Sequence, residues 1–111
     1  MDIEDPLFIH HSDHPGMVLV TKKMDGLTMP HRRSLMNMVL SAKNKLWFVR
    51  GLVPNPERNE VLENAWQRCN DIITSWLLNN LTPDIYESVL YSDFPSQIWK
   101  DLDDRYNQPK G

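Results

Sequence analysis

The sequence predicts an all-α fold in which a short N-terminal extended arm or strand precedes about four helices packed as a bundle. Apolar residues recur at helical spacing in two long segments, residues 35–47 and 61–77. Two further segments open with residues that favour a helix start, at Thr82 and Asp93. Hydrophobic residues make up 41% of the 111-residue chain, which also holds four tryptophans, so one domain with a substantial core is expected.

The predicted N-terminal arm covers residues 1–28, and the predicted helical domain covers residues 29–111. Within the arm, the sequence MVLVT at residues 17–21 predicts a short strand, because it is apolar and bounded by turn signals. The pair Asp25-Gly26 predicts the turn that closes the arm.

The first helix is expected to begin near Pro30, since proline suits the first helical position. One apolar stripe then runs from Leu35 to Trp47, and Gly51 with Pro54 and Pro56 stops the helix. The basic residues that fall largely outside this stripe are Arg32, Arg33, Lys43 and Lys45.

The second helix is expected to open at an asparagine cap, Asn59, and to run to about Asn80. Its apolar face begins at Val61 and is broad enough for the centre of a bundle. Cys69 lies on that face and is expected to act as a small buried hydrophobe.

The third and fourth helices are marked by their starts. Thr82 supplies a cap with Pro83 at the first helical position, and Asp93 precedes the last apolar-periodic segment. We expect three tryptophans to anchor the core, and we expect Trp76 to contact the helix that carries Trp99. The three anchors are Trp66, Trp76 and Trp99.

Three of the four histidines lie within residues 10–14, together with an aspartate. Imidazole and carboxylate groups are competent zinc ligands. However, Pro15 and Gly16 make a helix that would align His10 with His14 improbable, and an extended chain points neighbouring side chains to opposite faces. We therefore expect a solvated turn and no metal.

The net charge of -3 hides an asymmetry along the chain. Residues 20–51 hold seven basic residues against one acidic residue, whereas residues 52–111 hold five basic against ten acidic. Such a split is compatible with nucleic-acid binding, with contact between copies, or with two ordinary solvated faces. The candidate residues for nucleic-acid binding or self-association are Lys22, Lys23, Arg32, Arg33, Lys43 and Lys45.

Catalytic signatures are missing from the sequence. It has no Gly-rich phosphate loop, no Ser/His/Asp signature and no His-Glu-x-x-His motif, so we expect no enzyme activity and no cofactor. The single cysteine fits a reducing compartment, and no apolar run approaches the length of a membrane span. The expected location is the cytoplasm, without a membrane partner.

Several blocks, in order, resemble the N-terminal Gag region of copia-type long-terminal-repeat retrotransposons, especially those of plants. These blocks are DPLFIHHSDHPGMVLVTK, DG, LSAKNKLWFVRG, AWQRCNDIITSWLLNNLTPDI and SVLYSDFPSQIWKDLDDRYNQ. The resemblance implies a truncated, capsid-like helical bundle that self-associates into particles enclosing the element's RNA. The CCHC zinc knuckle that usually supplies much of the RNA binding is absent, so any RNA binding is expected to be weak and independent of sequence.

One block departs from the family pattern D-G-x-N-Y-x-x-W-S-R-x-M. Thr28 and Met29 stand where the family has Asn-Tyr, and Arg32 stands where it has tryptophan. The departure leaves three alternatives open: a self-assembling Gag-like domain, a relict copy, or a module that binds nucleic acid or a host partner through basic residues between 22 and 50.

Overall fold

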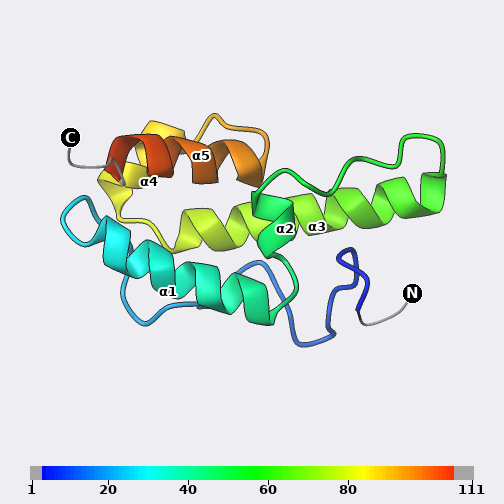
Figure 1. The fold of residues 1–111 in the computed structure, drawn as a ribbon, viewed down its shortest axis with the longest axis horizontal. Coiled ribbons are helices and arrows are strands. Elements are labelled where there is room, and N and C mark those ends of the chain that lie inside the picture. The colour runs from blue at the N-terminus through cyan, green and yellow to red at the C-terminus, as the bar shows by residue number, and fades with distance from the viewer. Residues whose placement is uncertain (1–3, 107–111) are drawn as a thin grey trace.

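The computed structural model describes residues 4–106 and is all-α over that range, which confirms the predicted fold class (Figure 1). In the view of Figure 1, α3 runs along the middle of the molecule, with α1 below it and α4 and α5 above it. The helices are α1 (Met29–Ala42), α2 (Leu46–Val49), α3 (Glu60–Asn79), α4 (Pro83–Val89) and α5 (Pro95–Tyr106).

The single helix expected from about Pro30 to Gly51 is wrong, because the chain turns between α1 and α2. Asn44 adopts a left-handed backbone with φ of 58°. The amide of Lys45 donates to the carbonyl oxygen of Leu40 at 2.8 Å, and the amide of Asn44 donates to that of Ser41 at 3.0 Å. This pair of hydrogen bonds is a Schellman motif, in which asparagine is an accepted substitute for glycine. The helix α1 therefore ends at Ala42, and the residues from Leu46 onward form a separate helix, α2.

The predicted strand at residues 17–21 is also wrong. In the described part of the chain, the extended pairing is limited to one isolated parallel bridge between Met24 and Leu81. The amide of Met24 donates to the carbonyl oxygen of Asn80 at 2.6 Å, and the amide of Thr82 donates to that of Met24 at 3.0 Å. A strand needs a partner with free backbone groups, and the neighbours of residues 17–21 are helices that have already used theirs.

The predicted starts of the later helices are largely confirmed. Asn59 caps α3, since its side-chain oxygen accepts a hydrogen bond from the amide of Leu62 at 3.1 Å. Pro83 opens α4 as expected. Thr82 occupies the cap position, but its side chain makes no capping hydrogen bond, and α5 begins at Pro95, two residues beyond Asp93. Val61 was expected in the apolar face of α3 but is 74% exposed.

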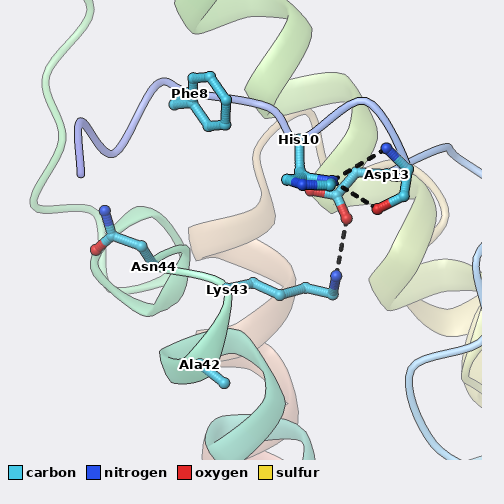
Figure 2. Close-up of a pocket in the computed structure, with 7 residues that line it drawn as sticks. Phe8, His10, Asp13, Ala42, Lys43 and Asn44 are labelled. Carbon is cyan, nitrogen blue, oxygen red and sulfur yellow. Dashed lines mark hydrogen bonds and ion pairs between the residues drawn. The ribbon is translucent and has the colours of Figure 1, made fainter. Parts of the chain in front are cut away.

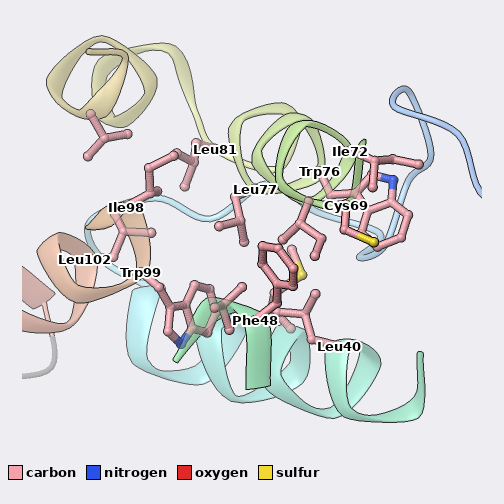
Figure 3. Packing of buried hydrophobic residues seen from close by; sticks show 14 of the residues in the cluster. Leu40, Phe48, Cys69, Ile72, Trp76, Leu77, Leu81, Ile98, Trp99 and Leu102 are labelled. Atoms are coloured by element: carbon pink, nitrogen blue, oxygen red, sulfur yellow. The ribbon is translucent and has the colours of Figure 1, made fainter. Parts of the chain in front are cut away.

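All the helices and the arm contribute to one hydrophobic core, part of which is drawn in Figure 3. Leu7 and Met24 join it from the arm. Trp66, Trp76 and Trp99 are all buried, and Trp76 is completely inaccessible. Figure 3 places Trp99 and Trp76 on opposite sides of the cluster, with Trp76 next to Ile72.

Candidate functional site

The N-terminal arm is held to the helices mainly by side chains that donate hydrogen bonds to its backbone carbonyls. Trp76 Nε1 donates to the carbonyl oxygen of His14 at 2.7 Å, and Asn79 Nδ2 donates to that of Pro15 at 2.8 Å. Both donors lie on α3. Because residues 4–23 of the arm pair with no strand, these side chains replace the hydrogen bonds that a sheet would have supplied.

A second set of donors comes from the turn between α1 and α2. Asn44 Nδ2 donates to the carbonyl oxygen of Glu4 at 2.8 Å. Lys45 Nζ donates to the carbonyl oxygens of Pro6, at 3.0 Å, and Phe8. The turn that interrupts the expected helix thus carries two side chains that fix the start of the arm.

Lys45 was expected to lie outside the apolar stripe, and this expectation is wrong. Its side chain is 2% exposed and sits beneath the arm. Burial lowers the pKa of the ammonium group, while Cys69 and nearby carboxylates oppose that shift. Lys45 therefore belongs to the interior and is removed from any surface that could meet RNA or another copy.

Cys69 is buried, as the sequence indicated, and it lies directly under the same part of the arm. Its Sγ donates to the carbonyl oxygen of Leu7 at 3.1 Å. Burial raises the pKa of the thiol, and Lys45 partly offsets this effect. A thiol in this setting stays protonated and is a packing group rather than a nucleophile.

Lys43 is also engaged with the arm, as Figure 2 shows. Its Nζ lies 2.8 Å from Asp13 Oδ1 and 5.4 Å from the centre of the Trp76 ring. The ion pair lies beside a cavity of about 410 Å³ between the arm and the end of α1. Asp13 thus serves as an anchor of the arm, and the charge of Lys43 is largely neutralised.

Arg33 joins α1 to α5. Its guanidinium lies 4.3 Å from the centre of the Trp99 ring and 3.2 Å from Asp103 Oδ1. Burial lowers the pKa of Arg33, and Asp103 opposes this shift. The ion pair thus links the half-exposed Asp103 of α5 to α1.

The remaining three candidate cations, Lys22, Lys23 and Arg32, border an open surface. Arg32 Nε donates to Thr28 Oγ1 at 2.7 Å, and Lys22 and Lys23 are exposed. A cavity of about 250 Å³ separates α1 from the segment that precedes Met24. We call it the α1 groove, and its lining includes Leu19, Val20, Lys22, Arg32, Leu35 and Met38.

The apolar character of the α1 groove was missed by sequence reasoning. Leu35, the first residue of the expected apolar stripe, is 41% exposed, and Met38 on the same helix is 68% exposed. The stripe was drawn on one long helix, whereas its residues belong to two helices, α1 and α2, that lie on either side of the turn at Asn44. The signal that could have revealed the groove was the presence of two large apolar residues, Leu35 and Met38, on the exposed face of α1.

The histidine rings lie at the surface, where His10 Nδ1 is 2.7 Å from Ser12 Oγ. Within residues 4–106, the structure contains no group of three or more His, Cys, Asp or Glu side chains placed to hold a metal ion. The role of this segment in the fold is carried by its backbone and by Asp13.

These features define a small helical domain with a fastened N-terminal arm and a partly apolar, partly basic groove. Residues 10–57 match the family model described as the Gag-polypeptide of LTR copia-type. The match covers most of the arm together with α1 and α2, and this part of the chain is similar to a copia-type Gag polypeptide. Searches of curated proteins and of solved structures gave no match.

The helices after the matched segment, α3, α4 and α5, carry the later blocks of the resemblance. Among the helices within residues 4–106, none is both long and apolar enough to cross a bilayer.

Proposed function

We propose that the chain is a structural, non-catalytic Gag-like domain of a copia-type retrotransposon whose copies associate weakly during particle assembly. The observation that carries this proposal is the family match over residues 10–57. The helical architecture and the fastened arm agree with a rigid building block, and the implied relationship to capsid domains is part of the proposal.

The α1 groove supplies a surface suited to contact between copies. Exposed apolar side chains, Leu35 and Met38, lie beside the cations Lys22 and Arg32. Protein interfaces commonly combine an apolar centre with a polar rim. A contact of this size is expected to be weak, and Gag-like assemblies gain strength by repeating weak contacts through many copies.

Sedimentation velocity over a hundredfold concentration range tests the proposal. We expect the average sedimentation coefficient to rise with concentration. The Arg32→Trp chain is a second sample, because an aromatic side chain at this half-buried position adds apolar area to the α1 groove. We expect stronger association, since aromatic burial contributes more than one exposed charge pair.

A strictly monomeric species at the highest concentration, in both the native chain and Arg32→Trp, would reject self-association. A relict fold or a module for a host partner would then be the better account.

Nucleic-acid binding is the second candidate function, and the exposed Lys22 and Lys23 favour it. Arg33, Lys43 and Lys45 are already committed to internal partners. With Arg32, about three cations remain, so the plot of log binding constant against log salt should have a slope near -2 for single-stranded RNA, from about -0.7 per phosphate.

Fluorescence anisotropy with unrelated single-stranded RNAs measures this slope. Lys22→Gln with Lys23→Gln should abolish most of the binding, whereas Arg58→Gln, an exposed arginine in the loop before α3, should leave it unchanged. Strong preference for one RNA sequence would contradict the proposed mode.

We also propose a cytoplasmic location, since the single cysteine is buried and unpaired and fits a reducing compartment.

A further inference from the structure

The α1 groove is large enough to accept a few side chains of another protein surface. Its volume of about 250 Å³ lies below the ~300–1,000 Å³ of typical small-molecule sites. Its lining is apolar at the exposed Leu35 and Met38 and basic at the exposed Lys22 and the half-buried Arg32. A fitting occupant combines apolar side chains with negative charge.

The last residues of α4 together with the turn that joins it to α5 have this combination. We call residues 87–94 the acidic turn. Three of its large apolar side chains are exposed, and Tyr91 is the most open at 90%. Glu87 and Asp93 are exposed in the same segment, and residues 83–99 contain no lysine or arginine. The other two exposed apolar residues are Leu90 and Phe94.

We propose that the acidic turn of one copy inserts into the α1 groove of a second copy, an inference that rests on the proposed self-association. Tyr91 and its apolar neighbours cover Leu35 and Met38, and the carboxylates of the turn approach Lys22 and Arg32. Apolar burial supplies the attraction, while complementary charge fixes the orientation and disfavours other partners.

The two surfaces lie on opposite edges of the molecule in Figure 1, with α1 along the lower edge and the segment between α4 and α5 along the upper edge. One copy therefore cannot fill its own groove. Because the two contacting surfaces differ, the contact is head-to-tail, and it generates rings or open chains of copies rather than a closed two-fold dimer. The native chain should thus grow beyond a dimer as its concentration rises.

Two substitutions test this arrangement, each at an exposed position so that the core is unaffected. Met38→Glu places a carboxylate in the α1 groove, and Tyr91→Glu replaces the main apolar side chain of the acidic turn. We expect each variant alone to associate at least tenfold more weakly than the native chain. Circular dichroism should show unchanged helix content in both.

An equimolar mixture of the two variants provides the sharper measurement. The intact turn of Met38→Glu can enter the intact groove of Tyr91→Glu, but the resulting pair has no further working surface. We expect a one-to-one heterodimer that does not grow with concentration. Val61→Glu, at an exposed position in the first turn of α3, is the matched control and should associate like the native chain.

The outcomes separate this inference from the proposed function. A native chain that associates while both variants associate equally well would overturn the head-to-tail contact and leave self-association intact. Loss of association in both variants without a heterodimer in the mixture would also overturn it. A native chain that stays monomeric at every concentration would reject both proposals.

Discussion

The indole nitrogen of Trp76 donates a 2.7 Å hydrogen bond to the carbonyl oxygen of His14, which joins the buried centre of α3 to the surface histidine segment. The histidine rings themselves are exposed. The contact between Trp76 and the histidine segment thus uses a backbone carbonyl of the segment and no histidine ring, although the two residues are 62 positions apart in the chain.

Trp76→Phe should release this part of the arm without collapsing the core. We expect a loss of about 0.5–1.5 kcal/mol for the hydrogen bond and faster proteolysis within residues 10–20. Trp66→Phe is the matched control, because Trp66 Nε1 donates to the carbonyl oxygen of Val53 at 2.9 Å, away from the arm. Trp76→Ala should cost roughly 3–5 kcal/mol in urea unfolding. Equal proteolysis of the arm in the two phenylalanine variants would contradict the assignment.

Lys45 and Cys69 should give opposite trends of stability with alkaline pH. The pKa of Lys45 is lowered from 10.5, so the unfolded chain binds more protons between the folded pKa and 10.5, and stability gains with pH in that window. The pKa of Cys69 is raised from 9.0, so the unfolded thiol ionises first and stability is lost as pH rises above 9.0.

Substitution separates the two trends. Relative to the native chain, Cys69→Ala should lose the decline above 9.0, and Lys45→Met should lose the rise toward 10.5. Chemical unfolding at a series of alkaline pH values measures both. Parallel pH profiles for the native chain and the two variants would show that neither group is linked to folding.

Asp25 should support the start of α1 until the solution becomes acidic. Its carboxylate accepts hydrogen bonds from the hydroxyl of Thr28 at 2.7 Å and from its amide at 2.8 Å, and these bonds lower the pKa of Asp25 below 3.8. The folded state therefore keeps the carboxylate ionised, and its contribution is present above 3.8 and fades as pH falls through the folded pKa. Asp25→Asn should remove this acid-side dependence, as thermal unfolding in acidic buffers would reveal. A native profile that Asp25→Asn reproduces would refute the role.

Zinc should leave the melting temperature unchanged at equimolar concentration. The rings of His10 and His14 are exposed, and a ligand that binds only the folded state would raise the melting temperature. Calorimetry with and without zinc checks this expectation. A zinc-dependent rise that disappears in His10→Ala or His14→Ala would establish a metal site.

Local signals predicted much of the helical architecture. Asn59 and Pro83 act within one turn of their own helices, so their effect on helix starts can be predicted without knowing the fold. The end of α1, just before Asn44, was harder to predict from the sequence, since asparagine adopts a left-handed backbone in some contexts and not in others. Overlooking it merged two helices and misplaced Lys45.

The arrangement of the candidate basic residues depended on distant partners that sequence reasoning could not supply. Arg33 meets Asp103, Lys43 meets Asp13, and Lys45 meets backbone carbonyls. Charge counting along the chain gives no information on which lysine or arginine will be neutralised. The exposed groups that remain, and the α1 groove beside them, emerge only when the arm is folded against α1.

Because the arm is attached through its backbone carbonyls, substitutions in the arm and in the helices should differ in their effect on this attachment. Every amino acid has the same backbone carbonyl oxygen, so the hydrogen bonds accepted by Pro6 and Pro15 depend on the conformation of the backbone and not on the side chain. The donors Lys45 and Asn79 must keep a side chain of suitable length and chemistry. A scan of all single substitutions should therefore find the hydrogen-bonding determinants of arm attachment mostly on the helices, whereas within the arm the sensitive positions should be the buried Leu7 and Met24 and the ion-paired Asp13.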